Sequence, residues 1–89
     1  MIMITIDANE FVTKHEMHAA LRAALGEENY YGSNLDALHD KLTSICEPTT
    51  IVIKNWSFAA RRLGEYADGL WHVLDDSADE NPNIKVVIE

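Results

Sequence analysis

Two aspartates four residues apart are the strongest chemical signal in this sequence. Asp36 and Asp40 lie in the segment NLDALHDKL, in which Leu35, Leu38 and Leu42 recur at helical spacing. At 100° per residue, the two carboxylates share a side of the helix that is roughly opposite the leucines, so we expect both to face solvent. Such a pair can accept charge-assisted hydrogen bonds from a cationic partner, or it can be an ordinary solvated helix face.

The histidines and the single cysteine point less clearly to chemistry. His15 and His18 could share a metal from one helix, but the sequence offers no third ligand, and histidines exposed on helices are common. His39 and Asp40 would point about 100° apart on a helix, which is poor geometry for a catalytic pair. Cys46 cannot form an internal disulfide and is expected to be a small buried thiol. Because no nucleophile motif or phosphate loop is present, we expect no enzyme activity, cofactor or metal.

Three apolar, β-branched stretches separated by helical patterns predict how these residues are positioned. Strands are expected over residues 1–7, 49–54 and 83–89, and helices over residues 13–26, 34–45, 57–64 and 66–80. Thr13 and Glu16 have capping-box spacing, while Asn34 and Ser57 are candidate N-caps. Long helical connections are typical of parallel strands. The pattern therefore predicts an α/β domain with a three-stranded, mainly parallel sheet, packed with three to four helices and covered on both faces.

Composition limits the class of protein. The 89 residues are 47% hydrophobic, which fits one globular domain over residues 1–89, and no apolar run is long enough for a membrane helix. The N-terminal residues do not form a signal-peptide pattern, and a single cysteine fits a reducing cytoplasm. With 15 acidic and 7 basic side chains, the formal charge of −8 disfavours nucleic acid and anionic membranes as ligands. It fits a cationic protein partner, or solubility alone.

One segment is similar to a known family. YYGSNLDALHDKL, residues 30–42, closely resembles the central segment of the barstar family, which are intracellular polypeptide inhibitors of secreted barnase-type ribonucleases. The likeness in length, strand number and helix placement extends over the whole chain, although identity is concentrated in this segment. The resemblance implies a single barstar-like domain that plugs a basic ribonuclease active site with the helix over residues 34–45 and the loop before it.

The resemblance also implies roles for individual residues. Asp40 would enter the phosphate pocket, and Asp36 would make a second ionic contact beside it. Tyr30 would pack on the base-recognition side, where Gly32 allows close backbone approach. The full set of partner-contacting residues that we expect is Tyr30, Tyr31, Gly32, Asn34, Asp36, His39, Asp40, Thr43, Ile45 and Asp76.

Some residues depart from the family pattern. His39 stands where the best-known member of the family is expected to have tryptophan, Ile45 replaces another aromatic residue, and Lys41 replaces a cysteine. Asp76 is one methylene shorter than the expected glutamate. We therefore expect the cognate ribonuclease to differ from barnase at its rim, and we expect this protein to be a monomer. An alternative is an immunity or regulatory protein that binds a different basic partner, such as a non-ribonuclease toxin domain.

Overall fold

The computed structural model describes residues 2–25 and 34–89. The elements in chain order are β1 (Ile2–Asp7), a 3₁₀ turn (Ala8–Glu10), α1 (Lys14–Leu25), α2 (Leu35–Thr43), β2 (Thr49–Lys54), α3 (Trp56–Leu63), α4 (Glu65–Glu80) and β3 (Ile84–Ile88). No helix among these residues is long and apolar enough to cross a membrane.

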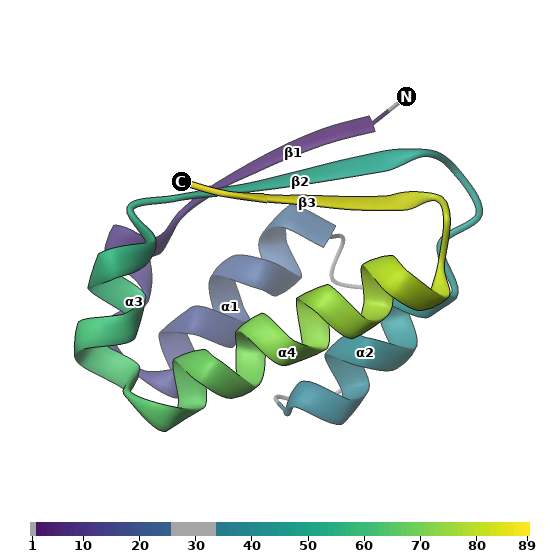
Figure 1. Cartoon of the computed structure of the whole chain (residues 1–89). Helices are drawn as coiled ribbons and strands as arrows, with labels where there is room; N and C mark the ends of the chain where they lie inside the picture. Colours follow the sequence, from purple (N-terminus) through teal and green to yellow (C-terminus); the bar gives the residue numbers. More distant parts are fainter. Residues whose placement is uncertain (1, 26–33) are drawn as a thin grey trace.

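The three strands form one parallel sheet in the order β1-β2-β3 (Figure 1). Ile51 in the central strand pairs with Ile4 on one side and Val86 on the other, so these three side chains lie on the same face. The predicted fold class, an α/β domain with a mainly parallel three-stranded sheet, is confirmed.

The expectation that helices cover both faces of the sheet was wrong. All four helices lie on one side of the sheet in Figure 1. Ile51 and Ile53 on that side are buried, whereas Met3 on the opposite face is 65% exposed. Each crossover adds the next strand in the same direction, and crossovers of the same hand then place their helices on the same face. The apolar runs of the strands therefore do not imply a second helical layer.

The core between the sheet and the helices is built mainly from aliphatic side chains. Phe11, which follows the 3₁₀ turn, is fully buried. The largest side chains that complete this core are Met17 and Leu21 of α1, Leu38 and Leu42 of α2, Ile51 and Ile53 of β2, and Leu70 and Leu74 of α4. The helical spacing of these residues is what fixes the solvent-facing side of each helix.

The predicted start of the first helix is confirmed, and that of the third is not. The Thr13 hydroxyl accepts a hydrogen bond from the Glu16 backbone N–H at 3.2 Å, which is one of the two hydrogen bonds of a capping box. The prediction that Ser57 caps the third helix was wrong, because α3 begins after Asn55, which has a left-handed backbone (φ 58°). Asparagine tolerates this conformation better than most residues, and its amide here donates to the Asp7 carboxylate at 2.9 Å.

Two single residues also lie differently from expectation. His18 is buried, with 1% of its surface exposed, and its Nε2 lies 2.6 Å from the Tyr66 hydroxyl of α4. It therefore does not share a surface with the exposed His15. Cys46, expected to be buried, is exposed because it follows the end of α2 in the connection to β2.

Candidate partner-binding site

Helix α2 is fixed by a local cap at its start and by the core along its inner face. The Asn34 side chain accepts a hydrogen bond from the Ala37 backbone N–H at 2.8 Å, which confirms the predicted N-cap. Leu38 and Leu42 are fully buried beneath the helix. A short helix held at its start and along its inner face presents its outer side chains on a defined backbone.

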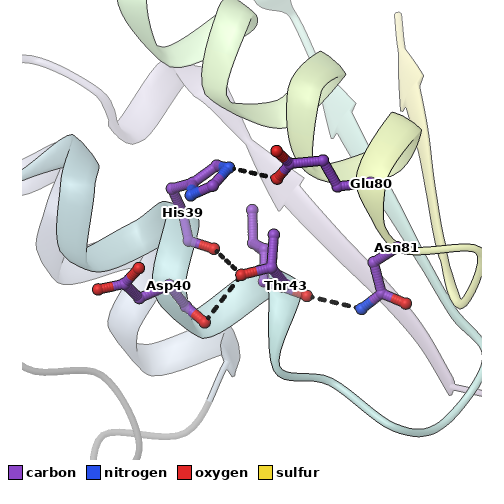
Figure 2. A network of polar contacts seen from close by, with 6 residues as sticks. His39, Asp40, Thr43, Glu80 and Asn81 are labelled. Atoms are coloured by element: carbon purple, nitrogen blue, oxygen red, sulfur yellow. Dashed lines mark hydrogen bonds and ion pairs between the residues drawn. The ribbon is translucent and has the colours of Figure 1, made fainter.

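Asp36 and Asp40 both lie on the outer side of α2 and are exposed, as the spacing predicted. Among the described residues, neither carboxylate forms an ion pair, and the neighbouring Lys41 is half-buried and does not neutralise them. In Figure 2 the Asp40 carboxylate points away from the side chains of His39 and Glu80. The two carboxylates are therefore available to cationic groups from outside.

Helix α4 packs against α2 and adds further acidic side chains. At Gly69, an added Cβ would lie 2.9 Å from the Leu35 side chain, so the missing side chain allows close approach of the two helices. Asp76 and Glu80 follow at intervals of seven and four residues, which places them on the same side of α4 as Gly69. Both are exposed. We call Asp36, Asp40, Asp76 and Glu80 the acidic face.

One side-chain pair links the two helices across this face. His39 Nε2 lies 2.7 Å from a Glu80 carboxylate oxygen (Figure 2). The side chains are 33% and 57% exposed, respectively, so the pair is accessible to a partner. The two residues are 41 positions apart in the chain. His39 is thus engaged with α4 and not with its sequence neighbour Asp40.

The C-terminal end of α2 is held by Asn81, the residue after α4. The buried Asn81 amide donates to the Leu42 and Ile45 carbonyl oxygens at 3.0 and 2.9 Å. The helix ends at Thr43, two residues before the predicted end, and Ile45 is half-buried against the core. The Thr43 hydroxyl donates to the His39 carbonyl oxygen at 2.9 Å, so toward a partner it retains only its capacity to accept.

The basic side chains lie mostly on other elements. Helix α4 carries no Lys or Arg. By contrast, α3 carries Arg61 and Arg62, and α1 carries Lys14 and Arg22. The charge of −8 is therefore distributed unevenly, because acidic side chains gather on α2 and α4. This distribution favours a cationic partner at that side of the molecule.

The groups with displaced pKa values lie elsewhere. Hydrogen bonds from the Asn55 amide and the Asn9 backbone N–H lower the pKa of Asp7. Burial lowers the pKa of His18, and the charge of Arg22 adds to the effect. Burial also raises the pKa of Tyr66. In the parts of the chain that are described, no three His, Cys, Asp or Glu side chains gather to hold a metal.

The described members of the predicted site come from two packed helices and one connection. Asn34 caps α2, while Asp36, His39, Asp40 and Thr43 lie on it; Ile45 follows it, and Asp76 lies on α4. Tyr30, Tyr31 and Gly32 fall outside the described residues. The sequence analysis missed Glu80 and Asn81. Glu80 could have been found from its spacing, because it lies one helical turn after Asp76. Asn81 could have been found from the Asn81-Pro82 dipeptide, which is typical of a helix end.

Comparison with known proteins gives two consistent matches. The model of a family described as Barstar (barnase inhibitor) matches residues 1–89. The chain is also 38% identical over 91 residues to a protein of Bacillus subtilis (strain 168) named "Putative ribonuclease inhibitor YrdF". That alignment covers 100% of this chain and 100% of the relative.

Proposed function

This chain belongs to the barstar family, and from that premise we propose that it inhibits a basic microbial ribonuclease by covering its active site with the acidic face. Support comes from the family match over the whole chain and from exposed carboxylates on two helices that are packed together. Such an inhibitor acts by stoichiometric occlusion and needs no catalytic group or cofactor of its own. We expect it to act as a monomer in the cytoplasm, as an immunity protein against the ribonuclease.

The central element of the proposal is phosphate mimicry by Asp40. A ribonuclease cleft binds the RNA phosphate with cationic side chains, and an exposed carboxylate can accept the same charge-assisted hydrogen bonds. Asp40 is exposed on the outer side of α2, opposite the buried Leu38 and Leu42. Because these leucines fix the helix in advance, little conformational freedom of the backbone is lost on binding.

The surrounding residues would shape the rest of the contact. Asp36 would make a second ionic contact one turn before Asp40, and Asp76 would contribute from α4. Asn34, whose side-chain oxygen caps the helix, would contribute a hydrogen bond to the partner. Thr43, His39 and Ile45 would border the contact at the other end of α2. The proposed contact also includes Tyr30, Tyr31 and Gly32, which lie outside the described residues.

Titration of barnase and related secreted ribonucleases with this protein tests the proposal. We expect stoichiometric inhibition of at least one of them. Asp40→Ala should weaken binding by about 2–5 kcal/mol, the range for truncating one member of a buried, hydrogen-bonded charge pair, for which barnase–barstar is itself a reference case. Asp75→Ala and Asp79→Ala are matched controls on exposed positions of α4, and each should cost less than about 1 kcal/mol.

The outcomes separate two kinds of partner. If all three substitutions cost about the same, the partner responds only to negative charge, and phosphate mimicry by Asp40 is excluded. If every ribonuclease retains full activity in a stoichiometric excess of the protein, the inhibitor proposal itself fails. Circular dichroism and thermal unfolding of each variant confirm that the comparison concerns binding and not folding.

A further inference from the structure

We propose that this protein binds an extended, cationic segment of a second protein in the groove between β3 and α4. At 100° per residue, Ala78 in this groove is turned about 200° around α4 from both Asp76 and Glu80. A segment held there leaves the acidic face free, so the inference does not depend on the proposed function. The β3–α4 groove has a volume of about 150 Å³ and is lined by Trp71, Leu74, Asp75, Ala78, Val86 and Ile88.

The first support is the unpaired edge of β3. Among the described residues, β3 pairs with β2 alone, and Figure 1 shows it at the border of the sheet beside α4. The Glu89 N–H donates to the Ile53 carbonyl oxygen at 2.8 Å, so the odd-numbered residues of β3 bond to β2. Val86 and Ile88 therefore direct their backbone N–H and C=O groups toward the open side of the strand. An extended segment can pair with these groups as an added strand.

The second support is the apolar surface of the groove. Trp71 is a large hydrophobic side chain that remains 42% exposed. Leu74 beneath it is buried, and Val86 and Ile88 on the strand are half-buried. Tryptophan is enriched among the residues that carry most of the binding energy in protein interfaces. The groove can therefore hold the apolar part of a long side chain against the indole ring.

The third support is the charge of the groove. Asp75 is exposed and forms no ion pair among the described residues. Asp68 and Asp79, also exposed, lie two turns before it and one turn after it on α4. Helix α4 carries no Lys or Arg, and Lys85 of β3 belongs to the opposite face of the sheet, because successive residues of a strand alternate. The groove thus matches Lys or Arg, whose stem would lie on Trp71 and whose charge would meet Asp75.

The same charge disfavours a second copy of this chain as the occupant. Two β3 strands paired edge to edge around a twofold axis would run antiparallel, with both α4 helices on the same side of the joined sheet. The exposed carboxylates of Asp68, Asp75 and Asp79 would then approach their own copies, and each chain carries a charge of −8. A cationic segment neutralises these carboxylates instead.

Titration with a short peptide in which arginine and valine alternate tests the inference. This alternation places all arginines on one side of an extended strand. We expect the peptide to bind about tenfold more tightly than the same peptide with glutamate in place of arginine. Methylation of the valine backbone nitrogens removes the donors for strand pairing and should weaken binding about fivefold. Calorimetry measures the dissociation constants.

Three variants test where the peptide binds. Trp71→Ala should weaken binding about tenfold, and Asp75→Asn should weaken it about fivefold. Glu10→Gln is the matched control, because it also removes one exposed carboxylate but lies on the 3₁₀ turn, outside both the groove and the acidic face. It should bind the peptide within about twofold of the wild type. Circular dichroism and thermal unfolding check that each variant is folded.

Hydrogen exchange measured by NMR locates the peptide at single amides. In the free protein, the Val86 and Ile88 N–H groups should exchange faster than those of Lys85 and Val87, which bond to β2. The arginine–valine peptide should slow exchange at Val86 and Ile88.

Several results would overturn the inference. Equal binding of the arginine and glutamate peptides would refute recognition by charge, and unchanged binding by Trp71→Ala would refute the groove as the site. Slower exchange confined to α2 would place the peptide on the acidic face. A dimer that forms through β3 without peptide, detected by sedimentation, would identify a second copy as the occupant. Ribonuclease inhibition is measured without the peptide, so none of these results would decide the proposed function.

Discussion

At the scale of single residues, the side chains of α1 and α2 divide sharply between solvent and core. Asp40 is exposed with no ion pair in the described structure, whereas His18 is buried and holds the Tyr66 hydroxyl at 2.6 Å. Burial lowers the pKa of His18 from the ordinary value of 6.5, and the charge of Arg22 adds to the effect. We therefore expect acid to lower the stability of the fold through protonation of His18.

The pH dependence of stability tests this role of His18. Because the pKa of His18 is lowered in the folded state, the unfolded chain binds a proton at higher pH than the folded chain. The contribution of His18 to stability is complete above about pH 7 and decreases as the pH falls below the unfolded value of 6.5. We expect the free energy of unfolding, measured in urea, to fall from pH 7.5 to pH 5.

A pair of histidine variants identifies the residue that is responsible. His18→Gln should be less stable at pH 7.5 but should show a smaller loss between the two pH values, because the titrating group is gone. His15→Gln, at an exposed position three residues earlier, should keep the slope of the wild type. An unchanged slope in His18→Gln would contradict the assignment.

At the scale of elements, α2 presents its carboxylates because it is fastened at three places. Asn34 caps its start, Leu38 and Leu42 anchor its inner face, and Asn81 of the segment after α4 holds its last carbonyl groups. These contacts come from different parts of the chain, so the orientation of the acidic face depends on the packing of α2 against α4.

Truncation of Leu38 tests the division of α2 into two faces. Leu38→Ala removes a fully buried side chain, and we expect it to lower the free energy of unfolding by about 2–5 kcal/mol. Asp40→Ala on the opposite side should change stability by no more than about 0.5 kcal/mol. Denaturant unfolding measures both. If Leu38→Ala left stability unchanged and abolished binding instead, the two faces would have been assigned in reverse.

At the scale of the whole molecule, the excess of negative charge lies over α2 and α4, and Arg61 and Arg62 of α3 lie outside this region. A charge distribution of this kind orients a cationic partner before contact, a behaviour for which barnase–barstar is also a reference case. The same field weakens over about 10 Å at 0.1 M salt.

The rate of association should therefore depend strongly on salt. We expect the association rate constant with the inhibited ribonuclease, measured by stopped-flow fluorescence, to fall steeply between low and near-molar salt. The dissociation rate constant should change less, since contacts within the formed complex are screened less than the long-range field. An association rate that does not change with salt would contradict electrostatic steering.

The sequence by itself determined the features that depend on neighbours in the chain. The strands, the N-caps at Thr13 and Asn34 and the outward direction of Asp36 and Asp40 follow from spacings of two to four residues, because backbone geometry fixes which positions share a face. The roles of the site residues toward a partner remain predictions, carried by the family resemblance.

Only the tertiary structure decided what distant segments bring together. The burial of His18 against Tyr66, the His39–Glu80 contact and the hold of Asn81 on α2 join residues 36 to 48 positions apart. The open face of the sheet and the exposure of Cys46 likewise depend on where the crossovers run. Local periodicity indicates that a side chain points inward or outward, but the side chain it meets there is chosen by the packing of whole elements.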